Sequence, residues 1–309
     1  MQWISYVDNR FGRKHSYAVN RKLSSYSKEA TFMGNCIYCN ESAGFLRRKH
    51  KDCYRKNQEG VCQVTSLIDK YILSDDQLSS LEQEISSISP SHYLASQQIK
   101  NILSSVWENT VDKVLDDGVL TKEEEEKLVR FKEHFNLTQD ELNKREGIIR
   151  LTKAAVLRDI LEGKIPKRVI ISDQNPFNLQ KNETLIWVFS RTEYLEDRVV
   201  KQYAGRSTGV SIRIAKGIYY RTNEFKGYPV IHTEKRSIDI GSLGITNKHI
   251  YFVGSSKIFR VNLQKIVSFT PYDDGVGIQK DNATAKPQTF ITGDGWFTYN
   301  LLCNLPQLF

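Results

Sequence analysis

This sequence contains few cysteines and no long apolar run, and both absences restrict what the protein can be. Its five cysteines are too few and too unevenly spread for a disulfide framework, so a cysteine cluster in a reducing compartment favours a metal site. No stretch approaches the ~18–20 apolar residues that a membrane span needs. The N-terminus also lacks the basic and apolar regions of a signal peptide. We therefore expect a soluble, cytoplasmic protein with no membrane span.

Standard catalytic signatures are missing as well. The sequence has no glycine-rich phosphate loop followed by Lys-Ser or Lys-Thr, no nucleophile elbow and no His-Glu-x-x-His motif. What is present is a globular composition, with 39% apolar and 26% charged residues in a chain of 309. This length is sufficient for two or three domains of ordinary size.

Positive charge is concentrated at one end of the chain. The formal net charge is +8, and residues 1–60 hold twelve Lys or Arg against five Asp or Glu, an excess of seven positive charges. Such asymmetry is typical of a module that binds a polyanion. The alternative is a basic surface that serves only solubility.

Two pairs of metal-ligating residues lie within this basic segment. Cys36-x-x-Cys39 is a knuckle that offers two thiolates to one ion, and His50-x-x-Cys53 places two further ligands on one face of a helical turn. Together they predict a closed Cys₃His site for a structural zinc ion, with Cys62 as an alternative ligand in place of His50. The pattern resembles a treble-clef zinc finger, which implies a hairpin and a ligand-bearing helix in a domain over residues 1–60.

Residues 61–168 predict a helical domain. Apolar residues recur at helical spacing over 64–73 and 99–107, and Ser89-Pro90-Ser91 predicts a helix start. Further along, Thr121 and Glu124 predict a capping box after the Asp116-Asp117-Gly118 turn. This turn between helices resembles the TerB-like helical domains, and the resemblance implies scaffolding or sensing.

Residues 175–309 predict a β domain. Short β-rich runs at 184–189, 209–214, 237–240, 241–252, 257–261 and 266–269 are followed by an amphipathic C-terminal helix. The runs 243–252 and 257–269 resemble bacterial PH-like and GRAM-like domains, which implies a small β-barrel or sandwich closed by a helix. The expected fold class is therefore α+β and multidomain.

The basic N-terminal module is where RNA chemistry is expected. Cleavage of RNA without a metal needs a general base, a general acid and cations for the phosphate. His15 is the candidate base, with an ordinary surface histidine as the alternative. The candidate nucleic-acid ligands, which equally suit a docking patch, are Arg10, Arg13, Lys14, Arg47, Arg48, Lys49 and Lys51.

The order of these modules resembles the ring-activated zinc-finger RNases, which are bacterial phage-defence effectors. The resemblance implies an endoribonuclease that stays dormant until it binds a ring-shaped phage protein assembly, forms a homo-oligomer and cleaves RNA through its finger. The alternative is a non-enzymatic adaptor whose finger and PH-like domain bind nucleic acid or protein. Such an adaptor leaves RNA intact under all conditions.

Overall fold

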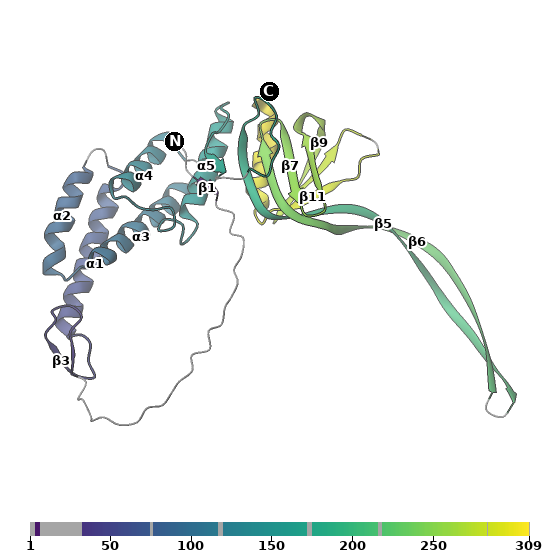
Figure 1. Ribbon diagram of the computed structural model, residues 1–309, viewed down its shortest axis with the longest axis horizontal. Helices are drawn as coiled ribbons and strands as arrows, with labels where there is room; N and C mark the ends of the chain where they lie inside the picture. Colours follow the sequence, from purple (N-terminus) through teal and green to yellow (C-terminus); the bar gives the residue numbers. More distant parts are fainter. Residues whose placement is uncertain are drawn as a thin grey trace. The chain divides into compact units, whose positions relative to one another are not determined.

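The computed structural model of the chain describes residues 4–6, 33–74, 77–116, 120–171, 175–215, 218–282 and 284–308. It divides into two compact units. We call Met1–Glu162 with Arg168–Asp173 the helical unit, and Gly163–Lys167 with Gln174–Phe309 the sheet unit. Helices α1 to α5 belong to the first, and a seven-stranded antiparallel sheet with helix α6 belongs to the second (Figure 1). The α+β class predicted from the sequence is confirmed.

Five helices form the body of the helical unit. They are α1 (Lys51–Tyr71), α2 (Leu78–Ser91), α3 (Ser96–Leu115), α4 (Lys122–His134) and α5 (Gly147–Leu161). Trp107 of α3 lies fully buried in their core, and its indole Nε1 donates a hydrogen bond to the carbonyl oxygen of Leu128, 2.9 Å away. This bond satisfies the one polar group of the largest core side chain. Two strands, β1 (Ile4–Tyr6) and β4 (Val169–Ile171), pair in parallel in the same unit.

The predicted capping box at the start of α4 is confirmed. The Thr121 hydroxyl accepts a hydrogen bond from the Glu124 backbone N–H, and the Glu124 carboxylate accepts one from the Thr121 N–H. The predicted helix start at Ser89-Pro90-Ser91 is wrong, because Pro90 lies in the last turn of α2. Pro90 has no N–H to donate to the carbonyl of Ser86, and the helix ends one residue later, so few helical hydrogen bonds are lost.

Four buried charges tie the segment before β4 to the bundle. Arg158 and Arg168 both donate to the carboxylate of Glu125, and Arg168 Nε lies 2.6 Å from Asp159 Oδ2. All four side chains are at most 15% exposed. Because each charge faces opposite charges, the cluster avoids the cost of an isolated buried ion.

The sheet unit is built on one antiparallel sheet in the order β8-β7-β6-β5-β11-β10-β9. Its strands are β5 (Leu185–Ala215), β6 (Ile218–Thr246), β7 (His249–Gly254), β8 (Ile258–Asn262), β9 (Ile266–Tyr272), β10 (Gly275–Lys280) and β11 (Gln288–Ile291). The edge strands β8 and β9 are joined by only three residues, η1 (Leu263–Lys265). The edges of a flat seven-stranded sheet would lie about 30 Å apart, which three residues cannot bridge, so the sheet must curl.

Helix α6 (Gly295–Asn304) covers the sheet through aromatic contacts. Phe297 is fully buried, and its ring lies edge-on to that of Trp187 with the centroids 4.9 Å apart. The expected C-terminal helix is therefore present. The strands beneath it form one seven-stranded antiparallel sheet, and the barrel or sandwich predicted from the sequence stays a prediction.

Strands β5 and β6 are far longer than the sequence suggested. The runs predicted at 184–189 and 209–214 both belong to β5, because the strand continues between them. Beyond the Asp197–Lys235 pair, the described parts of β5 and β6 pair only with each other, as far as Ala215 and Ile218. We call this extension, residues 198–234, the ribbon; Figure 1 shows it continuing past the other strands. Within the described residues, no helix has the length and apolar character to cross a membrane.

Candidate metal centre

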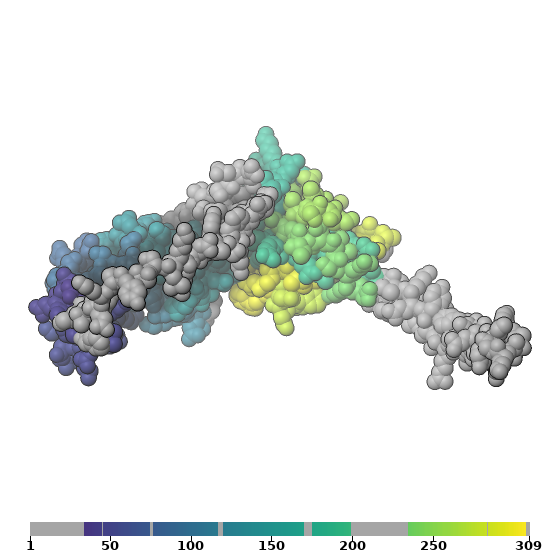
Figure 2. All heavy atoms as spheres, turned by 60° about the horizontal axis from the view of Figure 1, so that its bottom comes forward, coloured from purple at the N-terminus to yellow at the C-terminus, as the bar shows by residue number. Residues whose placement is uncertain are grey.

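The candidate metal centre is built on a short hairpin and the start of α1. Strands β2 (Met33–Asn35) and β3 (Ser42–Phe45) pair in antiparallel register, and the knuckle Cys36–Cys39 connects them. The Asn40 N–H donates to the carbonyl of Cys36 at 2.9 Å and closes the knuckle, with Asn40 at a φ of +60°. Asparagine tolerates this left-handed conformation better than most residues. Figures 1 and 2 show this part of the chain, coloured purple, at one end of the helical unit.

The four predicted ligands come together. The ligand atoms of Cys36, Cys39, His50 and Cys53 all lie within 4.8 Å of one another. His50 Nδ1 is 3.4 Å from Cys39 Sγ and 3.7 Å from Cys53 Sγ. Zn–S bonds of about 2.3 Å in tetrahedral geometry place donor atoms about 3.7 Å apart. The cluster can therefore hold a metal ion.

The orientation of His50 is fixed from outside the cluster. Its Nε2 lies 3.0 Å from the carbonyl oxygen of Ser42, to which only a protonated nitrogen can donate. That assignment leaves the lone pair of Nδ1 directed at the sulfurs, as metal-binding histidines require. Because the partner is a backbone carbonyl, this contact could not be recognised from the residue types.

Electrostatics prepare the cluster for a cation. Burial raises the pKa of the Cys36 thiol, but backbone N–H groups of Cys39, His50 and Tyr38 donate to its sulfur and outweigh burial, lowering the pKa to about 6. At Cys53, burial and then the neighbouring thiols raise the pKa to about 11. The neighbouring sulfurs therefore disfavour deprotonation of Cys53. A divalent cation bound between them would favour the thiolate instead.

Helix α1 joins the metal cluster to the bundle without a break. Cys53 lies in its first turn, and Val64 and Ile68 in its later turns are buried in the bundle core. Cys62 lies nine residues beyond Cys53 on this helix, about 13 Å along its axis. It is exposed and does not belong to the cluster, so His50 fills the position that Cys62 might have taken.

The loop between α2 and α3 packs against the first half of α1. The buried amide of Asn57 donates to the carbonyl oxygens of His92 and Tyr93 at 3.3 and 3.1 Å. A Cβ added at Gly60 would lie 2.4 Å from the His92 Cβ, so only glycine allows this approach. The Tyr93 ring lies 6.2 Å from that of Tyr38 in the knuckle, centroid to centroid, which places this loop beside the cluster.

Comparison with protein-family models, curated proteins and solved structures finds no match to this chain. Its chemistry is therefore argued from its own residues.

We call residues 33–60, which carry the cluster, the finger. Four of its cations, all predicted to bind nucleic acid, lie next to the cluster. Arg47, Arg48, Lys49 and Lys51 are all exposed. Lys49 Nζ lies 3.6 Å from the centroid of the Tyr54 ring. The other three side chains form no ion pair within the described part of the chain. Two of these cations lie on the loop before α1 and Lys51 is the first residue of α1, so three cations without an ion pair in the described residues lie beside the cluster and suit phosphate.

The remaining predicted site residues lie outside the described residues. They are His15, Arg10, Arg13 and Lys14. In the described finger the only histidine is His50, and both of its ring nitrogens are engaged. Phosphate binding is thus the chemistry that the described geometry supports, and the general base remains a prediction.

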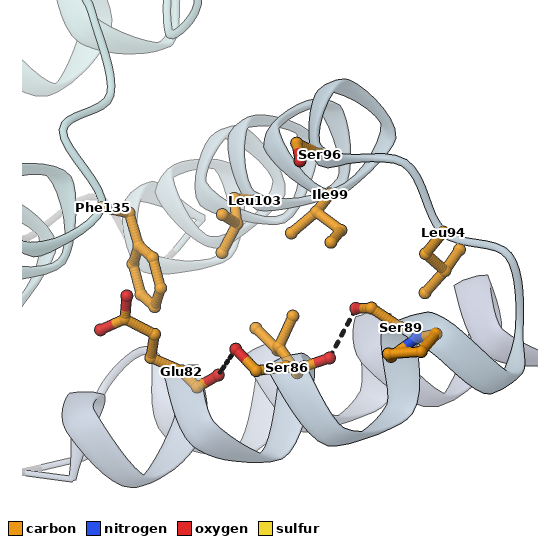
Figure 3. Close-up of a pocket in the computed structure, with 10 residues that line it drawn as sticks. Glu82, Ser86, Ser89, Leu94, Ser96, Ile99, Leu103 and Phe135 are labelled. Atoms are coloured by element: carbon orange, nitrogen blue, oxygen red, sulfur yellow. Dashed lines mark hydrogen bonds between the residues drawn. The ribbon is translucent and has the colours of Figure 1, made fainter.

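A groove between α2 and α3 has a volume of about 400 Å³ (Figure 3). The hydroxyls of Ser86 and Ser89 on its wall already donate to helix carbonyls. Its only charged lining residue is Glu82, which lies 3.2 Å from His134 Nε2. Without a cation in its lining, this groove does not extend the phosphate-binding surface.

Proposed function

We propose that this chain is an endoribonuclease effector that binds RNA through its metal finger. The observation that carries the proposal is the set of exposed cations, Arg47, Arg48 and Lys51, which have no acidic partner in the described residues and lie beside the Cys₃His cluster. Phosphates release counterions from such a surface and bind it in a salt-dependent manner.

The metal is proposed to be zinc in a structural role. Cys36, Cys39, His50 and Cys53 would hold it, because thiolate and imidazole donors at this spacing suit zinc. Four protein ligands leave no open coordination position for a substrate. The ion would fix the knuckle and the loop of residues 46–50, and the cations on that loop would hold the RNA backbone.

Activation is proposed from the resemblance to ring-activated zinc-finger RNases, from which no catalytic position is carried over. His15 is proposed as the general base because it is the only histidine of residues 1–60 besides His50, and Arg10, Arg13 and Lys14 are proposed as further phosphate ligands. A phage protein assembly is assigned as the activator, and a homo-oligomer as the active state. The helical and sheet units would then serve sensing and assembly.

The test is RNA integrity. Purified protein is incubated with total RNA, with and without lysate of phage-infected cells, as wild type and as the Cys36→Ser, His15→Ala and Cys62→Ser variants. We expect lysate-dependent degradation that Cys36→Ser abolishes and Cys62→Ser retains. Further loss in a folded, metal-loaded His15→Ala variant would identify the base. Intact RNA in all samples, across several phages, would reject the nuclease.

The second candidate is an adaptor that binds nucleic acid or protein without cleaving RNA. One observation favours it: in the described finger, the only histidine is committed to the metal cluster. An adaptor would bind RNA or a protein in the assay above and leave the RNA intact. Its expression in an activated state would also not be toxic.

A further inference from the structure

Two apolar side chains stand out at the surface of the finger. Ile37 in the knuckle is 68% exposed and Leu46 after β3 is 77% exposed. The two loops that carry them are joined by a hydrogen bond from the Ile37 N–H to the carbonyl oxygen of Arg48, 2.9 Å long. We call Ile37, Leu46, Arg47, Arg48 and Lys49 the finger tip.

The backbone holds Leu46 outward at an energetic cost. Its φ is +57°, in the left-handed region that costs a residue other than glycine about 1–2 kcal/mol. The next residue, Arg47, donates its N–H to the carbonyl of Gly44 at 3.4 Å, which closes the turn. Because the side chain is exposed, burial within the finger does not offset this cost.

Two aromatic side chains near the cluster already contact other groups. The Tyr38 ring lies 6.2 Å from that of Tyr93, centroid to centroid. The Tyr54 ring, in a residue that is 40% exposed, is covered by Lys49 Nζ on one face. Ile37 and Leu46 are therefore the most exposed large apolar side chains described beside the cluster.

We propose that the finger tip binds single-stranded RNA, with unstacked bases against Ile37 and Leu46 and phosphates on Arg47 and Arg48. This inference rests on the proposed RNA-binding function and names its substrate class. An A-form duplex presents phosphates and 2′-hydroxyls but keeps its base faces stacked inside. Against a duplex the two apolar side chains would stay in water, whereas a splayed base removes them from it.

The positive charge of the finger tip favours a nucleic acid over a protein as its ligand. A hydrophobic protein partner would fit the two apolar side chains alone. It would, however, leave Arg47 and Arg48, which have no ion pair in the described residues, without a counter-charge unless it were acidic. A nucleic-acid strand supplies both a charge at every nucleotide and an apolar base face.

The experiment measures binding to the metal-loaded full-length protein by fluorescence anisotropy at fixed salt. The probes are a labelled 2′-O-methyl RNA strand without self-complementarity, which a 2′-hydroxyl-dependent nuclease cannot cleave, and the same strand annealed to its complement. The test variants are Leu46→Asn and Ile37→Ser, and the matched control is Ile258→Ser, an isoleucine 76% exposed on β8 of the sheet unit. Metal content and melting temperature are recorded for each.

We expect each test variant to weaken single-strand binding about fivefold, because about 1 kcal/mol of apolar contact is lost. Duplex binding should not change, and Ile258→Ser should change neither. Arg47→Gln with Arg48→Gln should weaken both forms alike and reduce the salt dependence. Asparagine accepts the backbone of position 46, so Leu46→Asn decides the matter if Ile37→Ser fails to load metal.

Two outcomes overturn different claims. If the wild type binds RNA but Leu46→Asn leaves single-strand binding unchanged, or weakens single and double strands equally, the base contact is rejected and RNA binding stands. If the metal-loaded wild type binds neither probe, the proposed function itself fails. In that case an acidic protein becomes the better candidate for the finger tip.

Discussion

At the residue scale, Asp239 of β6 holds the turn between β7 and β8. Its carboxylate accepts hydrogen bonds from the backbone N–H groups of Ser256 and Lys257, at 2.7 and 2.8 Å. These bonds, the one from Ser256 first, lower the pKa of Asp239 from 3.8 to about 2. A carboxyl group whose pKa is lowered by folding stabilises the protein above its unfolded pKa, and this stabilisation is lost as the pH falls through the folded pKa.

Asp239→Ala should therefore lower the melting temperature of the sheet unit at neutral pH. Its remaining stability should also decline less than that of the wild type as the pH falls from 3.8 to about 2. Thermal unfolding across this range measures both effects. Asp281→Ala, which removes an exposed carboxylate from the same unit, is the control. Equal pH dependence in Asp239→Ala and the wild type would show that Asp239 does not contribute to it.

The cluster of Cys36, Cys39, His50 and Cys53 was predictable from the sequence, because its chemistry lies in the side chains and their spacing. The exposed position of Leu46 was not predictable. The role proposed for it depends on a left-handed backbone and on the absence of covering side chains, and neither follows from its being a leucine.

At the element scale, the ribbon is the feature with the least support from the rest of the sheet. Among the described side chains, the last buried one along β5 is Tyr194, and the first buried one along β6 is Asp239. An isolated pair of strands is only marginally stable in water. We predict that replacing residues 199–233 with Asn-Gly, between the paired residues Arg198 and Glu234, leaves the sheet unit folded.

The shortened protein should melt within about 4 °C of the full chain, corresponding to about 1 kcal/mol. Differential scanning calorimetry measures this, and circular dichroism checks that the remaining strands are retained. A fall of tens of degrees, or loss of a cooperative transition, would show that residues 199–233 contribute to the fold of the unit.

The start of α4 was predicted from the sequence because the interaction that marks it is local. Thr121 and Glu124 satisfy each other within four residues, so the capping box could be recognised in the sequence. The length of β5 could not be, because its pairing with β6 joins residues up to 61 positions apart, as in Leu185 with Thr246. Likewise, α1 crosses residue 60 as one helix because Asn57 and Gly60 pack on a distant loop. The domain boundary predicted there stays a prediction.

At the scale of the whole molecule, the division into two units gives the metal a specific thermodynamic signature. All four metal ligands lie in the helical unit, so only this unit should depend on the ion. Structural zinc sites contribute of order ~10 kcal/mol to folding. Two unfolding transitions are therefore expected, and only one should respond to metal.

Cys36→Ser should lower the metal content and shift the transition of the helical unit to lower temperature, while the sheet unit is unchanged. Strong chelation of the wild type should do the same. The loss should also reach past residue 60, because α1 carries Cys53 in its first turn and Ile68 in the bundle core. Hydrogen exchange should then quicken at residues 51–71 and at the contacting loop of His92 and Tyr93.

Cys62→Ser is the matched control, since it removes an exposed thiol from the same helix outside the cluster. It should retain the metal and both transitions. Full metal content in Cys36→Ser, measured by elemental analysis, would reject the ligand assignment. Faster exchange confined to residues 33–60 would instead show that the finger folds apart from the bundle, and that the contacts of Asn57 and Gly60 do not carry the stabilisation onward.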